Sequence, residues 1–193
     1  MKEYSMIADV SRAMISIMQK ALVPDIVASN DSIGLCSPAD RNDISLGLFL
    51  YDIIESDELR RSTTRTNTIS DRLNYPPIYL NLYYMITPYF TGNVKYRMLS
   101  EQEALGRLIQ QFHDYPLISA DEVAKENENV IDLRLEMLRL DNEEKSKIWT
   151  FPNEPYRTSL FYKVSPVVIN SSRYRDITRV SEANIHVNNM NKR

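Results

Sequence analysis

One apolar stretch bounded by prolines constrains this chain more than any other feature. From Pro76 to Tyr89 the sequence reads PPIYLNLYYMITPY. Alternate side chains of a β-strand point to opposite faces of a sheet, so a period of two predicts a strand. One face would carry only apolar side chains, those of Ile78, Leu80, Leu82, Tyr84 and Ile86. The stretch is therefore built to be held in a sheet.

Periodic patterns elsewhere predict three helices and three more strands. The expected helices run from Ile7 to Ala21, from Ser100 to just before Pro116, and from Asp141 or Asn142 to Trp149. The expected strands are Ile44 to Ile54, Val130 to Leu138 and Thr158 to Ile169. Pro166 removes one backbone donor from the last strand, so we expect an edge or a bulge there.

The second helix has a predicted start and a predicted buried face. Ser100 and Glu103 have the spacing of a capping box, which satisfies backbone N–H groups at a helix start. The apolar stripe expected to face the core consists of Leu105, Leu108, Ile109 and Phe112. Pro116 marks the end of this helix.

The connecting segments are polar. Asn30 to Asn42 is rich in turn residues, Ser56 to Asn74 is expected to be an exposed loop or a projecting hairpin, and Ser119 to Asn129 is acidic. The element order predicts an α+β fold, a mainly antiparallel sheet of about four strands with helices packed on one face. We expect a single domain over residues 1–169, followed by a polar C-terminal arm over residues 170–193.

Composition excludes several function classes. The 193 residues include 23 Lys and Arg against 26 Asp and Glu, and the formal charge of -3 gives no global attraction to nucleic acid or to an anionic membrane. Cys36 is the only cysteine, so an intrachain disulfide is impossible and a cysteine-based zinc site lacks ligands. No apolar run approaches the roughly 20 residues of a membrane span, and we expect folding in a reducing cytoplasm.

No residue pattern indicates catalysis. His113 lies near a helix end and His186 in the polar tail, where structural or surface roles suffice. Cys36 has no histidine near it in sequence, so we expect an inert thiol. A Gly-x-Ser-x-Gly elbow is absent, and Glu143 with Glu144 fits a helix start. We therefore expect no enzyme activity, no metal and no cofactor.

Four arginines form the clearest candidate binding segment. They are Arg60, Arg61, Arg65 and Arg72. Guanidinium groups bind carboxylates and phosphates in bidentate fashion, but nearby acidic residues partly neutralise this cluster. A solvated loop, a protein interface and a nucleic-acid contact all remain open for this segment.

Five motifs in the same order resemble the tail-terminator, or cap, proteins of phage-tail-like contractile injection systems. They span Ile7 to Ser11, Leu50 to Arg60, Pro76 to Thr87, Leu105 to Pro116, and Trp149 to Val167. Arg61 and the turn at Pro152 to Glu154 depart from the family pattern. The resemblance covers the N-terminal domain of that family; some relatives also carry an additional C-terminal domain.

The resemblance implies a non-enzymatic structural protein. It would form a ring, expected to be hexameric, at the tail end distal to the baseplate, and would stop growth of the inner tube and the sheath. Assembly would take place in the cytoplasm, on a particle that can be released, without nucleic-acid or membrane partners. The expected interface residues are Arg60, Arg61, Arg65, Arg72, Tyr89, Arg173, Tyr174, Arg175 and Arg179. The alternative is a nucleic-acid or regulatory protein-binding module that uses the loop from Arg60 to Arg72.

Overall fold

The computed structural model describes residues 3–56, 68–69, 72–123 and 131–176. Its centre is a six-stranded sheet with strand order β1-β2-β5-β8-β7-β6. The strands are β1 (Ile33–Leu35), β2 (Leu46–Glu55), β5 (Ile78–Pro88), β6 (Leu117–Ile118), β7 (Leu133–Met137) and β8 (Leu160–Ile169). All neighbouring pairs are antiparallel except β1 with β2. The predicted α+β class is confirmed, with six strands in place of about four.

The predicted proline-bounded strand is β5, and it lies at the centre of the sheet between β2 and β8. Its inward side chains Leu82, Tyr84 and Ile86 are completely buried. The edge strand β1 falls in the segment that was expected to be only a connection. Three residues carry too little alternation to signal a strand, and only pairing with β2 reveals it.

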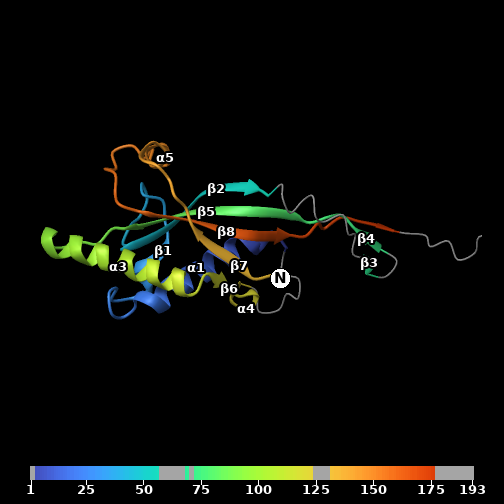
Figure 1. Cartoon of the computed structure of the whole chain (residues 1–193), viewed down its shortest axis with the longest axis horizontal. Coiled ribbons are helices and arrows are strands. Elements are labelled where there is room, and N and C mark those ends of the chain that lie inside the picture. The colour runs from blue at the N-terminus through green and yellow to red at the C-terminus, as the bar shows by residue number, and fades with distance from the viewer. Residues whose placement is uncertain (1–2, 57–67, 70–71, 124–130, 177–193) are drawn as a thin grey trace, which may run out of the picture.

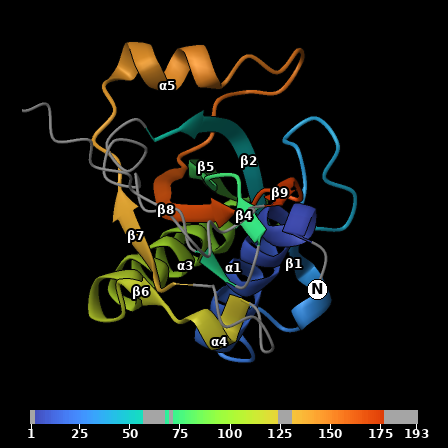
Figure 2. The same cartoon turned by 90° about the vertical axis from the view of Figure 1, so that its right-hand side faces the viewer.

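Two helices cover one face of the sheet (Figures 1 and 2). They are α1 (Met6–Leu22) and α3 (Val94–Asp114), which also pack against each other. The main core lies between them and the sheet, and contains Met14 and Met18 of α1 beside Leu82 and Tyr84 of β5. The Tyr84 hydroxyl and the Ser11 Oγ are 2.8 Å apart, so the buried phenol has a hydrogen-bond partner. The predicted first helix is confirmed.

A second, smaller core lies on the opposite face. The short helix α5 (Asn142–Ile148) follows a capping box formed by Asp141 and Glu144. In this core Trp149 and Phe151 pack with Met85 and Phe161 of the sheet. Helices were expected on one face only, and α5 departs from that expectation (Figure 2).

The start of α3 differs from the prediction. The N-cap is Asn93, whose side chain accepts a hydrogen bond from the Lys95 backbone N–H, so the helix begins at Val94. Ser100 lies inside the helix, and the predicted capping box does not form there. The buried stripe contains Ala104, Leu105, Leu108 and Phe112, whereas Ile109 is 38% exposed. The helix therefore begins about three turns before its buried stripe.

Pro166 lies at an irregularity in β8, as expected. The register between β5 and β8 shifts between Leu80 and Leu82, opposite the extra residues around Pro166. Although β8 is a central strand, the proline is accommodated because the bulge leaves its missing N–H outside the ladder. β7 pairs with β8 only as far as Ser165, so β5 and β8 continue beyond it as a narrower ribbon.

The ribbon leads into a second, three-stranded sheet. Its strands are β3 (Thr68–Ile69), β4 (Arg72–Asn74) and β9 (Tyr174–Asp176), in the order β3-β4-β9. β4 precedes β5, and β9 follows β8, so the pairing of β4 with β9 continues that of β5 with β8. This sheet projects from the body at the end opposite to the start of α3 (Figure 1). The expected projecting hairpin is present in the part of 56–74 that is described.

The register of α3 predicts that substitutions at two neighbouring residues change the free energy of unfolding by very different amounts. Leu108→Ala removes a fully buried side chain and should lower the free energy of unfolding by about 2 to 5 kcal/mol. Ile109→Ala removes a partly exposed side chain and should cost less than about 1 kcal/mol. Urea unfolding measures both stability losses, provided that the two variants have the same m-value. A larger loss for Ile109→Ala would contradict this helix register.

Candidate functional site

Three segments converge on Tyr89, directly after β5. Its ring is 5% exposed and lies close to two guanidinium groups. The Cζ atoms of Arg41 and Arg157 are 5.0 and 5.5 Å from the ring centroid. A cation near an aromatic face is attracted by the ring quadrupole, more strongly where water is excluded. The ring thus joins the loop before β2 to the loop before β8.

Each of the two arginines beside Tyr89 also forms an ion pair, and we call Tyr89, the two arginines and their acidic partners the Tyr89 cluster. Arg41 Nη1 lies 3.4 Å from a Glu154 carboxylate oxygen, and Arg157 Nη1 lies 3.4 Å from a Glu101 oxygen on α3. All four side chains are at most 35% exposed, so water screens these pairs less than fully exposed ones. The cluster holds both loops and α3 together at one end of the sheet.

Gly47 allows this cluster to close. A Cβ at position 47 would lie 2.4 Å from Cys36 Sγ and 2.9 Å from Tyr89 Cε2, closer than real Cβ contacts. Burial raises the pKa of the Cys36 thiol to about 11, partly offset by Arg41. Burial also raises the pKa of the Tyr89 phenol to about 12. Both groups are therefore neutral at pH 7, and the thiol is unsuited to act as a nucleophile.

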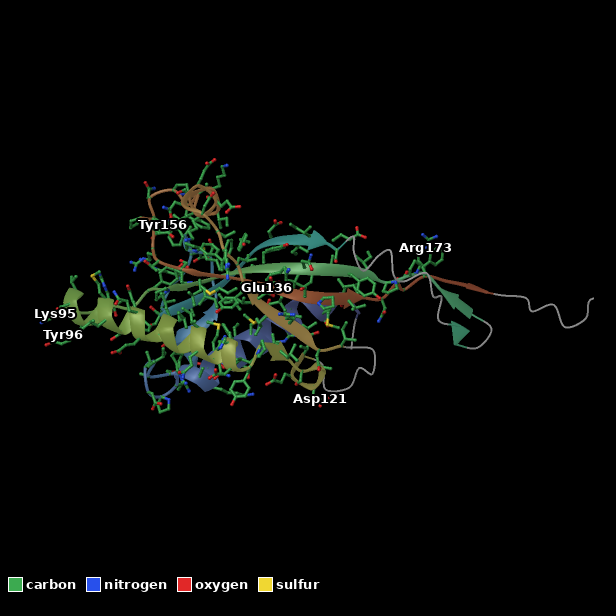
Figure 3. All side chains as sticks on the ribbon, in the orientation of Figure 1. Lys95, Tyr96, Asp121, Glu136, Tyr156 and Arg173 are labelled. Carbon is green, nitrogen blue, oxygen red and sulfur yellow. The ribbon has the colours of Figure 1, made fainter. Side chains whose placement is uncertain are left out.

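The sheet face beside α5 carries an amphipathic strip that the helix leaves uncovered. Tyr51 and Tyr83 lie with ring centroids 6.1 Å apart, and Lys163 follows on the neighbouring strand, opposite Tyr83. Lys163 Nζ lies 2.8 Å from a carboxylate oxygen of Glu136, and this hydrogen bond lowers the pKa of Glu136. Figure 3 places Glu136 along the middle of the molecule. This strip has neutralised charges and suits packing against a protein surface.

The predicted interface residues fall into three groups. Arg60, Arg61, Arg65 and Arg179 lie outside the described residues. Arg72, Tyr174 and Arg175 belong to the paired strands β4 and β9 of the projecting sheet. Arg173 precedes β9 and its Cζ lies 4.6 Å from the Tyr75 ring centroid (Figure 3). The structure therefore brings Arg72 and residues 173–175 together, although they are far apart in sequence.

Tyr89 lies apart from that group. It is buried at the opposite end of β5, where its ring packs between the two arginines described above. Its ring is not available to a partner in this conformation. Arg41, Arg157, Glu101 and Glu154 were not predicted as interface residues, because no periodicity or spacing links residues on three separate segments.

The described residues offer no candidate metal centre. Among them, no group of three or more His, Cys, Asp or Glu side chains is placed to hold a metal ion. His113 is exposed in the last turn of α3. No helix among the same residues is long and apolar enough to cross a membrane.

Two solved structures resemble this chain over nearly its whole length. A cryo-EM structure of the sheath/tube terminator of the extracellular contractile injection system PVC, in the extended state, matches 95% of this chain with a TM-score of 0.67 and 18% identity. The tube-terminating cap of the anti-feeding prophage matches 93% with a TM-score of 0.65 and 18% identity. The chain spans 64% and 61% of the lengths of those two proteins. No curated protein sequence matches significantly.

The fold is thus an α+β domain of the terminator-cap type. At 18% identity the structural likeness shows the fold alone. The sequence adds the family, because the model of the Pvc16 N-terminal domain matches residues 9–182. The chain belongs to the Pvc16 N-terminal domain family, and the resemblance seen in its motifs is confirmed.

Two glycine substitutions test the packing around Tyr89. Gly47→Ala places a methyl group against Cys36 and Tyr89, and should lower the free energy of unfolding by about 1 to 3 kcal/mol. Gly106→Ala is the matched control: the position lies in α3 with open space around it, so stability should rise by up to about 1 kcal/mol. Thermal and urea unfolding measure both; an unchanged stability of Gly47→Ala would refute the close contact.

The environment of Cys36 predicts slow alkylation. The thiol pKa rises from 9.0 to about 11, so at pH 9 about half of the unfolded thiol is ionised against about one part in a hundred of the folded thiol. Iodoacetamide should therefore label the folded protein about 50-fold more slowly than the urea-unfolded protein at pH 9. Labelling of folded protein should accelerate as the pH approaches 11. Equal rates in the two states would rule out the buried, protonated thiol.

Proposed function

We propose that this protein is a terminator cap of an extracellular contractile injection system. It ends the growth of the inner tube and the sheath at the end distal to the baseplate. The observation that carries this proposal is the fold match over 95% of the chain to a sheath/tube terminator. Membership of the Pvc16 N-terminal domain family supports it independently of the coordinates.

The proposed assembly is a closed ring of six copies. A terminator must present one face that copies the contacts of the last filament layer and another face on which nothing further adds. A ring meets this requirement, because each subunit contacts the next through two different surfaces and rotation closes the set. The elongated chain separates such surfaces widely: the start of α3 and the β3-β4-β9 sheet lie at opposite ends of the molecule (Figure 1).

The projecting sheet is the proposed docking element for the filament. It carries Arg72 and residues 173–175, four of the interface residues expected from the sequence. Its outer strands β3 and β9 have two and three residues, respectively. An outer strand has one edge that is not paired within its own sheet, so an arm of a sheath subunit can add there as a further strand. No cofactor is required for this role, and the proposed role is structural.

Removing the gene from the producing system tests the cap directly. Without a terminator, electron micrographs should show tubes and sheaths of widely scattered length, with no density at the distal end. Restoring the intact gene should restore a single length and the end density. Particles of normal length with normal distal density in the deletion strain would refute the proposed function.

A further inference from the structure

The start of α3 is an apolar helix end that the described part of the chain leaves exposed. Val94, Tyr96, Met98 and Leu99 are 59%, 68%, 51% and 52% exposed. These side chains point in several directions around the helix, so packing one side of the helix against the rest of the protein cannot bury all of them. Figure 3 shows Lys95 and Tyr96 at the extreme end of the molecule. We call residues 94–99 the α3 tip. Apolar side chains clustered in this way mark an interaction site.

The base of the α3 tip contains a buried guanidinium nitrogen that has no hydrogen-bond partner among the described residues. Arg97 is half-buried, and its Nε atom is buried without a hydrogen bond. It lines a pocket of about 280 Å³ together with Ser32, Ser45, Thr91 and Ser100, and no acidic residue lines that pocket. A buried polar atom without a partner is costly, so this arrangement favours a ligand that brings an acceptor. Carboxylates are the protein groups that guanidinium binds best.

The other end of α3 also has exposed apolar side chains, but the charged side chains around them are acidic. Tyr115 and Leu117 are 67% and 55% exposed just after the helix, and Ile131, shortly before β7, is 45% exposed. Four exposed carboxylates accompany these apolar side chains, those of Asp114, Asp121, Glu122 and Asp132. We call this surface the acidic patch. Among the described residues, the Lys and Arg side chains next to it are Lys20, which lies 3.5 Å from Glu122, and Arg134, which pairs with Leu117. The acidic patch therefore keeps an excess of negative charge.

We infer that the α3 tip of one copy binds the acidic patch of the next copy. Both surfaces carry exposed apolar side chains. Their charges are complementary, because the α3 tip carries Lys95 and Arg97 and the acidic patch carries Asp114 and Asp121. The two surfaces lie about 30 Å apart along one helix of 21 residues. Because they differ from each other, the contact is heterologous, which generates a ring when the rotation closes. This contact deepens the proposed function by naming the surfaces that join neighbouring subunits, and it rests on that function for its place in the particle.

Directed cross-linking between two single-cysteine variants tests the contact. Tyr96→Cys and Tyr115→Cys alter side chains of nearly equal exposure, 68% and 67%, and both are made with Cys36→Ser. A mixture of the two variants should form an oxidised dimer of one copy of each. Neither variant alone should cross-link. Ile54→Cys, exposed on β2, is the control and should not cross-link with either.

Charge reversal gives a second readout in the same mixture. Arg97→Glu in the Tyr96→Cys copy should lower the yield of the mixed dimer about tenfold or more. Asp121→Lys in the Tyr115→Cys copy should recover part of that loss. Cross-linking of Tyr96→Cys with itself would overturn the proposal, because it indicates a symmetric contact. Absence of the mixed dimer in folded variants would overturn it as well.

Repeating the mixture inside assembled particles separates this inference from the proposed function. Distal density by electron microscopy without the mixed dimer refutes the contact and leaves the cap role standing. The mixed dimer in purified protein, with particles that carry no density of this protein at the distal end, refutes the cap role and leaves the contact standing.

Discussion

Burial of the inner face of β5 holds the structure together. Leu82, Tyr84 and Ile86 are completely removed from water, and each fully buried side chain of this size contributes about 1.5 to 3 kcal/mol. Because β5 is paired on both sides, its main-chain groups are satisfied at the same time. The helices α1 and α3 pack where they do because this apolar surface has to be covered.

The two segments proposed to bind other subunits lie beyond the ends of this hydrophobic core. α3 continues beyond its buried stripe into the α3 tip, and β5 with β8 continues beyond β7 toward the projecting sheet. Neither extension has a core of its own within the described residues. The cluster around Tyr89 secures the loops next to the α3 tip, so the helix end is presented from a fixed base. A rigid centre with unsupported ends is the form expected of a subunit that completes its burial in an assembly.

The sequence predicted correctly those features of the fold that depend on a few neighbouring residues. The strand β5, the helix α1 and the bulge at Pro166 were all readable, since period and proline chemistry act within a few residues. The start of α3 was misplaced because Ser100 and Glu103 match a capping box, while Asn93 offers the actual cap seven residues earlier. The family was also readable from motif order, and the family model confirms it.

The sequence by itself determined the long strands and helices and the absence of an intrachain disulfide, because these follow from local periodicity and from residue counts. Only the tertiary structure decided which side chains meet. Arg41 and Arg157 are distant in sequence yet approach the same buried ring, and the buried Nε atom of Arg97 finds no hydrogen-bond partner among the described residues. Such contacts depend on how separate segments are brought together by the sheet, and no local pattern encodes that placement.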